Sequence, residues 1–525
     1  MTTPMHWARW GDPAHATALP EAAAGLIDAV FGTEDRPTVD LIEVRLPEPG
    51  LSPELLDGLR ALLGSAHVLT DHEARVRHTR GKSTPDLLRI RQGDAADAPD
   101  AVLLPAGHDQ VQAVVKWCTE HRVALVPFGG GTSVVGGLAA QCDGLAGVVA
   151  LDLSRLNRLV AVDAESHTAE LEAGLLGPEA ERLLAEHGLT IGHFPQSFQY
   201  ASIGGFAATR SSGQSSAGYG RFDSLVVGLR VATPLGTLEL GTSPANAAGP
   251  DLRQLVLGSE GAFGVITSVT VRVRPVPQVR VYESWRFDSF AEGTAALRTL
   301  VQERIAPTVL RLSDEAETAI NLAKPAEVGG ENAGGCLAIV GFEGTREYVD
   351  RAHAVVTERL HALGGKNLGE DGGRAWAEGR YHGPYLRDSL LDVGVLVETL
   401  ETATFWSNLP ALYTGVKTAL ETSLEGASPI VLCHISHVYE TGASLYFTVA
   451  AKQAADPLAQ WAAAKAAASD AMIAAGATIT HHHAVGRDHK PWFEQEIGPV
   501  GVEMLRAVKQ RIDPAGVLNP GVLVP

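Results

Sequence analysis

The feature that most constrains this chain is a run of three glycines directly after a predicted strand. The run lies within Val126-Pro127-Phe128-Gly129-Gly130-Gly131-Thr132-Ser133-Val134, and the predicted strand covers residues 124–128. Three glycines permit positive φ angles and leave no Cβ between the backbone and a ligand. Their N–H groups can converge on a phosphate, and Thr132 and Ser133 add hydroxyl donors. Taken alone, the triplet fits a tight turn without a ligand equally well.

Two further segments are rich in glycine and small residues. One runs from Ser202 to Gly213, and the other runs from Gly258 to Thr267, where a predicted strand begins. Three such loops indicate a long ligand held by backbone contacts, as a dinucleotide is. None is a Gly-x-Gly-x-x-Gly motif after a first strand, so a Rossmann-type nicotinamide site is not supported. Gly81-Lys82-Ser83 is not a P-loop, because that motif needs glycine where the chain has Val76.

The predicted elements indicate an α+β protein of several parts. Residues 1–95 are helical and loop-rich, and residues 96–277 hold short strands and glycine-rich turns without regular βαβ alternation. The sequence Arg274-Pro275-Val276-Pro277 predicts a boundary. Beyond it, a second domain of strands and long helices covers 278–480, and a C-terminal segment covers 481–525. Residues 328–335 (VGGENAGG) predict a loop.

Charge and composition exclude several classes of function. The chain has 42 Lys and Arg against 61 Asp and Glu, a net charge of −19. Nucleic-acid binding is therefore not expected, because phosphate neutralisation needs clustered Lys and Arg. The four cysteines lack metal or disulfide spacing, as is typical of thiols in a reducing cytoplasm. No signal-peptide core or membrane-spanning stretch is present, so we expect a cytoplasmic protein without a transmembrane segment.

The glycine-rich segments belong to an ordered set of motifs. These are PFGGGTSV, GHFPQSFQYASIGGFAATRSSG, YGRFDSLVVGLRVATPLG and GPDLRQLVLGSEGAFGVIT. The set resembles the FAD-binding domain of the vanillyl-alcohol oxidase / p-cresol methylhydroxylase superfamily, and within it the alkyldihydroxyacetonephosphate synthases, from Arg75 to Asn519. The resemblance implies an FAD-binding domain of two subdomains over 96–277 and a substrate-binding cap domain with an antiparallel sheet and flanking helices over 278–480. The C-terminal segment would return to the active site. Ser224 departs from the family, which is expected to have an acid there.

The resemblance implies noncovalent FAD, with the loop Gly129–Ser133 on its pyrophosphate. The residues implied as FAD contacts are Pro127, Phe128, Gly129, Gly130, Gly131, Thr132, Ser133, Gln196, Ser197, Ser202, Gly204, Gly205, Thr209, Arg210, Ser211, Ser212, Gly258, Ser259, Glu260, Gly261, Gly264, Val265 and Ile266.

The triplet His481-His482-His483 is the most unusual run in the chain. If the segment is extended, the side chains of His481 and His483 point one way and that of His482 points the other. A metal site would need further ligands, for which His489 or the pair His434 and His437 are candidates. A packed or solvated cluster and proton transfer near neutral pH are the other interpretations. The resemblance implies catalysis by the triplet, so we expect no metal.

Three further side chains are candidates for the same site. Tyr446 lies in a predicted strand, and the resemblance implies that it is the catalytic acid/base, which would require nearby positive charge to lower its pKa from about 10. Arg311 lies in an otherwise apolar strand, where a guanidinium needs an anionic partner. Arg387 could simply pair with Asp388. The resemblance implies that Arg311 acts in catalysis and in substrate binding, and that Arg387 binds substrate, whose phosphate suits a guanidinium.

The implied reaction exchanges the acyl group of acyl-dihydroxyacetone phosphate for a long-chain alcohol through an adduct at flavin N5, without net redox change. It belongs to ether lipid synthesis. The expected partners are the phosphorylated lipid, the fatty alcohol and a second copy of the chain in a homodimer, with peripheral membrane contact left open. Two alternatives remain: an FAD-linked oxidase or dehydrogenase of a 2-hydroxy acid, and a flavin-binding protein without turnover. The hydroxy-acid enzymes usually carry one His in a Glu-His-Gly type signature, so the triplet discriminates between them.

Overall fold

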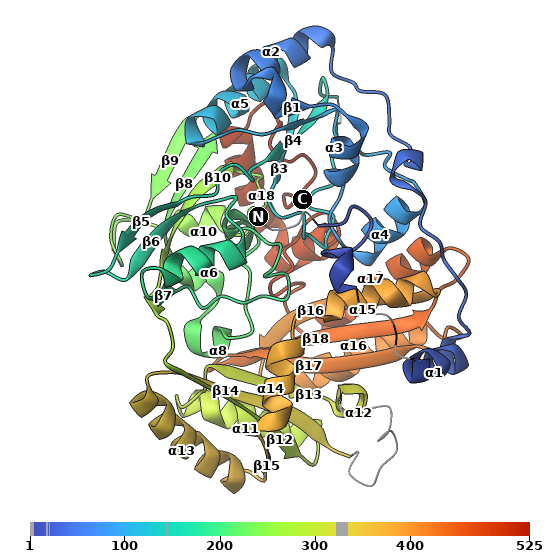
Figure 1. Cartoon of the computed structure of the whole chain (residues 1–525), viewed down its shortest axis with the longest axis vertical. Helices are drawn as coiled ribbons and strands as arrows, with labels where there is room; N and C mark the ends of the chain where they lie inside the picture. The colour runs from blue at the N-terminus through green and yellow to red at the C-terminus, as the bar shows by residue number, and fades with distance from the viewer. Residues whose placement is uncertain (1–4, 17–18, 20, 143, 322–333) are drawn as a thin grey trace.

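The structure is a computed structural model that describes residues 5–16, 19, 21–142, 144–321 and 334–525. Most of the loop predicted over 328–335 therefore lies outside the described residues. The protein has two main parts, which Figure 1 shows one above the other: most of the blue and green elements lie above, and a large sheet in yellow and orange lies below, with the dark blue helix α1 (Glu21–Phe31) beside it. Helices and sheets are mixed in both parts, which confirms the α+β prediction.

The first part holds three sheets. A four-stranded sheet has the order β1-β2-β4-β3, in which β2, β4 and β3 are parallel and β1 is antiparallel. A five-stranded antiparallel sheet has the order β5-β6-β10-β8-β9, and β7 pairs with β11. The strands are β1 Val68–Leu69, β2 Ala101–Leu103, β3 Ala124–Phe128, β4 Val148–Asp152, β5 Leu159–Asp163, β6 Thr168–Glu172, β7 Leu189–Thr190, β8 Val226–Thr233, β9 Gly236–Leu240, β10 Val265–Arg272 and β11 Arg274–Pro275.

The helices that precede residue 279 are short, and most of them flank these sheets. They are η1 Pro13–His15, α1 Glu21–Phe31, η2 Leu41–Glu43, α2 Pro53–Leu63, η3 Ser65–His67, α3 His72–Arg77, α4 Thr84–Arg91, α5 His108–His121, α6 Gly177–Ala185, α7 Ile203–Ala208, α8 Ser216–Tyr219, α9 Phe222–Leu225 and α10 Arg253–Val256. Strands β3 and β4 are nearly continuous apolar runs, as parallel strands covered on both faces are.

The second part is built on a seven-stranded antiparallel sheet of order β15-β12-β14-β13-β17-β18-β16. Its strands are β12 Val279–Phe287, β13 Val309–Ser313, β14 Cys336–Gly344, β15 Lys366–Gly369, β16 Val395–Phe405, β17 Ile430–Val438 and β18 Gly442–Lys452. Its helices are α11 Phe290–Gln302, α12 Glu315–Asn321, α13 Arg346–Ala362, α14 Glu370–Gly379, α15 Gly383–Asp392, α16 Leu409–Ser423 and α17 Pro457–Ala474. The predicted cap, an antiparallel sheet with flanking helices, is present.

Each part has its own hydrophobic core. The first core draws on residues between Leu51 and Val273 and on Val517 and Leu518. The second draws on Leu87 and Leu88 and on residues between Trp285 and Ile479. The boundary proposed at residue 277 falls between these cores, while residues before 95 contribute to both.

The C-terminal segment returns to the first part. Helix α18, Lys490–Ile512, is kinked at Gly498, where φ is +68° and Pro499 follows. Leu518 then forms a parallel bridge with Leu125 of β3. In Figure 1 the dark red helix accordingly lies among the blue and green elements. The last residues of the chain are thus part of the first core.

Asn519 secures this return, because its Nδ2 donates to the carbonyl oxygens of Gly137 (3.1 Å) and Glu260 (2.6 Å). We expect Asn519→Gly, which tolerates the positive φ of this residue, to lower the free energy of unfolding of the first part by about 1–3 kcal/mol. Urea denaturation followed by tryptophan fluorescence measures the change. The exposed Asn246→Gly is the matched control, and equal stability of the two variants would contradict the prediction.

Candidate active site

A cavity of about 410 Å³ lies between the two parts of the protein. The glycine-rich segments line it on one side, and strands β13, β16, β17 and β18 with helix α15 line it on the other. Three distant stretches of sequence that were predicted to act together therefore do border one space.

The loop after β3 offers unused hydrogen-bond donors to this cavity. In the described part of the chain, the backbone N–H groups of residues 129–134 donate to no other group. The buried Oγ of Ser133 and Nε2 of Gln196 also lack partners there. Such a set of amide and side-chain donors suits an anion. The stretch of residues 129–134 is long enough to contact the diphosphate of a dinucleotide. The residues present therefore fit FAD.

The glycines are required for packing between the loops. A Cβ on Gly130 would overlap the carbonyl oxygen of Tyr200, and one on Gly129 would overlap Oγ of Ser202. Gly131 has a φ of +69°, which favours glycine. Gly130 therefore has a packing role: its missing side chain leaves room for the backbone of Tyr200 and Ala201, which is thereby held at the cavity wall.

Most of the residues predicted to bind FAD line the cavity. They are Pro127, Gly129, Gly130, Gly131, Thr132, Ser133, Gln196, Ser197, Ser202, Gly204, Gly205, Thr209, Ser211, Glu260, Gly261, Gly264, Val265 and Ile266. Ser212 lines only a smaller adjoining cavity of about 70 Å³.

Four of the predicted FAD contacts lie outside the cavity lining and support it instead. The ring of Phe128 packs on His78, with centroids 4.5 Å apart. Arg210 donates to the carbonyl oxygen of Leu257 and packs against Gly258, and Ser259 is buried beside them. The acid missing at Ser224 has a counterpart one residue earlier, because the Asp223 carboxylate pairs with Arg221 (3.3 Å) and Arg210 (3.6 Å).

On the cap side, strand alternation places three candidates on the cavity face. Arg311, His434 and Tyr446 line the cavity, while their sequence neighbours pack into the second core. His434 is the cross-strand partner of Tyr446, and their rings stack with centroids 4.9 Å apart. The sheet therefore presents one polar face to the glycine-rich loops.

Arg311 is already paired with a carboxylate. Its Nη2 lies 2.6 Å from Oε1 of Glu317 and 3.1 Å from Nδ1 of His434. Burial alone would raise the pKa of Glu317, but His434 and Arg311 lower it to about 2, so the carboxylate stays charged. The positive charge of Arg311 is thus compensated before any substrate binds.

Arg387, unlike Arg311, has no carboxylate of the described chain within hydrogen-bond distance. Its Nη1 donates to the carbonyl oxygen of Lys82 at 2.7 Å, but its buried Nε and Nη2 have no hydrogen-bond partner among the described residues. The expected local pair with Asp388 is weak: Nη2 is 3.8 Å from Oδ1, and that carboxylate pairs with Arg91 at 3.0 Å. Arg387 lines the cavity, and its Nε and Nη2 donors can bind an anion there.

Tyr446 is a neutral phenol in this site. Burial raises its pKa to about 12, and the positive charge of Arg387 offsets this only in part. Positive charge is therefore present near Tyr446, as a role in acid/base chemistry would require, but burial outweighs its effect on the pKa. The protonated hydroxyl can donate a proton to a group in the cavity.

The histidine triplet is not extended, and its predicted alternation is wrong. Residues 481–483 form a bend around the fully buried carboxylate of Glu401, which accepts the backbone N–H groups of His481 (2.6 Å), His482 (3.1 Å) and His483 (2.8 Å). Wrapping around one carboxylate turns His482 and His483 toward the cavity, where both lie beside Tyr446, and turns His481 away. Burial lowers the pKa of His482 to about 3, so its ring is neutral at pH 7.

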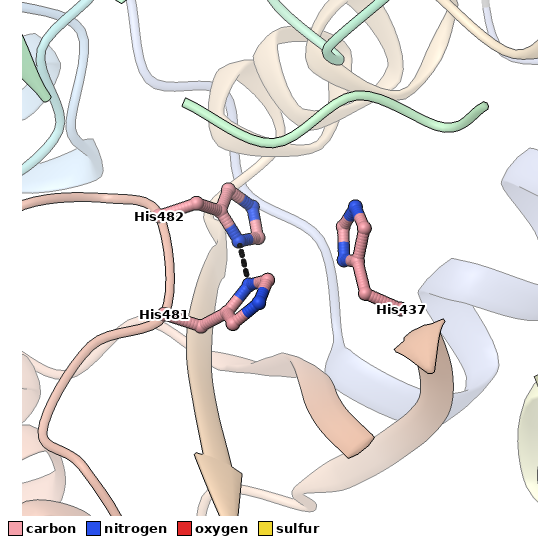
Figure 2. A group of neighbouring side chains, drawn as sticks. All are labelled: His437, His481 and His482. Atoms are coloured by element: carbon pink, nitrogen blue, oxygen red, sulfur yellow. Dashed lines mark hydrogen bonds between the residues drawn. The ribbon is translucent and has the colours of Figure 1, made fainter. Parts of the chain in front are cut away.

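His437 joins His481 and His482 in the cluster that Figure 2 shows. One ring nitrogen from each lies within 4.8 Å of the others. However, His437 Nε2 lies 3.0 Å from the Gly213 carbonyl oxygen, and His481 Nε2 lies 2.6 Å from the Tyr439 hydroxyl. His489, the other suggested ligand, contacts the Ala484 carbonyl oxygen instead. Existing hydrogen bonds thus occupy these nitrogens, and the absence of a metal stays a prediction that chelator treatment tests.

Several residues of the site carried no signal in the sequence. Glu317 and Glu401 are single acids in a chain with 61 Asp and Glu, and only the fold shows that they are buried against cations and amides. Trp10 lines the cavity from the N-terminal segment, far from every motif. Strand alternation around Cys433 and Ile435 could have singled out His434.

The protein families that the chain matches agree with a flavin site at this cavity. Residues 99–241 match the FAD binding domain family, and residues 276–523 match the family of FAD linked oxidases, C-terminal domain. The chain is 34% identical to the alkyldihydroxyacetonephosphate synthase of Dictyostelium discoideum over 95% of this chain and 85% of that one. FAD is therefore the cofactor, as predicted; its noncovalent attachment stays a prediction, which acid precipitation tests.

Solved structures resemble the whole fold. An alkyldihydroxyacetonephosphate synthase structure is 32% identical, with a TM-score of 0.85 over 99% of both chains. A p-cresol methylhydroxylase structure has a TM-score of 0.69 at 19% identity, over 90% of this chain and 98% of that one. The predicted superfamily fold is thus confirmed.

We expect Gly130→Val to abolish FAD retention. The valine side chain would push the loop away from Tyr200 and move the N–H donors of residues 129–134 apart. The ratio of flavin absorbance to protein absorbance in the purified variant measures retention. Gly107→Val is the matched control, since open space surrounds that glycine and its backbone is extended. A yellow Gly130→Val protein with a full flavin spectrum would contradict the prediction.

Proposed function

The chain belongs to the alkyldihydroxyacetonephosphate synthase family, and on that premise we propose that it exchanges the acyl group of acyl-dihydroxyacetone phosphate for a long-chain alcohol. It is an FAD-dependent enzyme of the ether lipid pathway. The observation that carries the substrate assignment is Arg387, which lines the cavity and whose buried Nε and Nη2 lack a hydrogen-bond partner in the described part of the chain. A planar guanidinium edge of this kind fits the phosphate that distinguishes this substrate from a simple hydroxy acid.

The residues around the cavity have different proposed roles, according to whether their side chains are charged or neutral. Arg387 binds and orients the phosphate. Arg311, held by Glu317 and His434, keeps a compensated positive charge at the cap sheet. The neutral phenol of Tyr446 donates a proton, and the neutral imidazoles of His482 and His483 accept protons. FAD, bound along residues 129–133 and 202–211, supplies a carrier for the carbon skeleton during the exchange.

The direct test is incubation of the purified holoenzyme with palmitoyl-dihydroxyacetone phosphate and labelled hexadecanol. We expect label in an alkyl-dihydroxyacetone phosphate product and equimolar release of palmitate. Palmitate release without label in the lipid would show hydrolysis instead and would overturn the proposal.

The alternative, oxidation of a 2-hydroxy acid, is less supported because family membership and the histidine triplet both favour the synthase. Bleaching of the flavin by D-lactate or glycolate under anaerobic conditions tests it. We expect no bleaching at concentrations that saturate hydroxy-acid enzymes.

We also propose that the enzyme acts in the cytoplasm as a homodimer in peripheral contact with membranes. In the described residues, no helix combines the length and the apolar character needed to cross a bilayer. Support for surface contact is the chemistry of the proposed substrates, both of which carry long hydrocarbon chains. Light scattering of the purified protein tests the homodimer. Sedimentation of the protein with phospholipid vesicles tests the membrane contact.

We expect Arg387→Lys to raise the KM for acyl-dihydroxyacetone phosphate about tenfold or more, because an ammonium cannot replace two coplanar N–H donors. Arg311→Lys should instead lower kcat, since Nη2 of Arg311 contacts both Glu317 and His434 and a lysine would not reproduce this geometry. Both variants should retain FAD. Steady-state kinetics measures the effects, and the exposed Arg304→Lys is the control. An unchanged KM in Arg387→Lys would remove this residue from the phosphate site.

We expect Tyr446→Phe to keep the flavin spectrum and to lower kcat by about 100-fold or more, because only the proton-donating hydroxyl is lost. Single-turnover release of palmitate measures the step directly. Tyr348→Phe, which removes a hydroxyl from an exposed ring, is the matched control. Full turnover in Tyr446→Phe would exclude the phenol from catalysis.

A further inference from the structure

A chain of polar groups runs from the buried Glu401 carboxylate through His482 and His481 to Tyr439. Nδ1 of His482 lies 3.4 Å from Oε2 of Glu401 and 2.9 Å from Nδ1 of His481. Nε2 of His481 lies 2.6 Å from the Tyr439 hydroxyl. Figure 2 shows the two imidazoles joined by their hydrogen bond.

The carboxylate decides which nitrogen of His482 carries the proton. Glu401 is fully buried, and its oxygens accept the backbone N–H groups of the triplet and the Thr480 hydroxyl, four donors that suit a carboxylate. A carboxylate can only accept, so its negative charge 3.4 Å away repels a lone pair on Nδ1 of His482 and stabilises an N–H there. The proton of the neutral His482 ring therefore lies on Nδ1.

The proton position on His481, and the role of Tyr439, follow from the proton position on His482. Only one proton fits between the two Nδ1 atoms, and His482 supplies it, so Nδ1 of His481 is bare. The proton of the neutral His481 then lies on Nε2 and is donated to the Tyr439 oxygen. The Arg221 guanidinium lies against the same hydroxyl. The Tyr439 oxygen thus accepts the last hydrogen bond of the chain.

This order leaves Nε2 of His482 without a proton. Within the described residues that nitrogen has no hydrogen-bond partner, and His482 lines both the large and the small cavity. We propose that Glu401 and Tyr439 fix the tautomer of His482 so that its bare Nε2 accepts the hydroxyl proton of the incoming alcohol. This inference rests on the proposed function.

The bonds balance over the exchange. The bond between C1 and the acyloxy oxygen breaks, and the fatty acid leaves as a carboxylate with the electron pair. The alcohol oxygen forms the new bond to C1, its O–H bond breaks, and the proton goes to Nε2 of His482. A hydroxyl becomes strongly acidic as its oxygen bonds to carbon, so a weakly basic imidazole that is fully unprotonated at pH 7 is suited to this proton. His482 is then a catalytic residue, and Glu401 and Tyr439 are positioning residues.

Tyr439→Phe is the decisive variant, because Glu401→Gln removes the centre of the bend and could prevent folding. Without the hydroxyl, the Nε2–H of His481 loses its acceptor. The pair then gains by reversing its proton order, which places a proton on Nε2 of His482. Tyr282→Phe is the matched control, since that hydroxyl also makes a side-chain hydrogen bond, to Oε1 of Glu343 at 2.5 Å, and Tyr282 lines neither cavity.

The first measurement needs no substrate. Nitrogen-15 NMR of the holoenzyme with ring-labelled histidine, assigned by His482→Gln, should show His482 protonated on Nδ1 and bare on Nε2. In Tyr439→Phe, the signal should shift toward the Nε2-protonated form, while Tyr282→Phe should match the wild type. A wild-type His482 that is protonated on Nε2 would overturn the inference.

The second measurement separates the two halves of the reaction. Tyr439→Phe should lower the rate of alkyl product formation by roughly 10- to 100-fold, within the usual range of general-base effects, and should leave single-turnover fatty-acid release and FAD retention unchanged. An equal loss in both halves would show a merely structural role for Tyr439 and would overturn the inference. If the wild-type enzyme performs neither half, the proposed function fails, and the tautomer found by NMR alone decides the positioning role.

Discussion

Two buried carboxylates, one from each part of the protein, hold the segment between residues 480 and 486, and the site depends on them. Glu401 of β16 accepts the N–H groups of the histidine triplet. Glu260, from the third glycine-rich segment, accepts the N–H groups of Val485 (3.2 Å) and Gly486 (2.7 Å). A buried carboxylate is costly unless its oxygens are satisfied, so each acid stabilises the segment and the segment in turn stabilises each acid. The histidines are thereby fixed between the FAD loops and the cap sheet.

Much of the fold could be predicted from the sequence, because its signals are local. The glycine triplet follows a continuous apolar strand, and the order of the motifs in the sequence is enough to identify the superfamily. Period-two alternation also explains why Arg311 and Tyr446 reach the cavity, since each stands between two apolar residues that face the second core. Such patterns depend only on neighbours in sequence, and a single chain is enough to reveal them.

The interior of the site could not be predicted in the same way, because its interactions join distant residues. Alternation failed at His481–His483 because Glu401, about eighty residues earlier, bends the backbone around itself. The pKa of Tyr446 rises because the cap and the loops exclude water from it, which no local pattern records. The partners of Arg311 and Arg387 likewise could not be distinguished by sequence: one guanidinium has a carboxylate, and the other has an open edge.

The return of the C-terminal segment has a consequence for how the protein is made. Glu260 and Glu401 are synthesised long before residues 480–486, whose N–H groups they bind. Domains that emerge early can fold early, but these two acids lack their backbone partners until residues 480–486 have also left the ribosome. Val517 and Leu518, which belong to the first core, follow later still. A nascent chain that stalls before residue 480 therefore has neither the active site nor a complete first core.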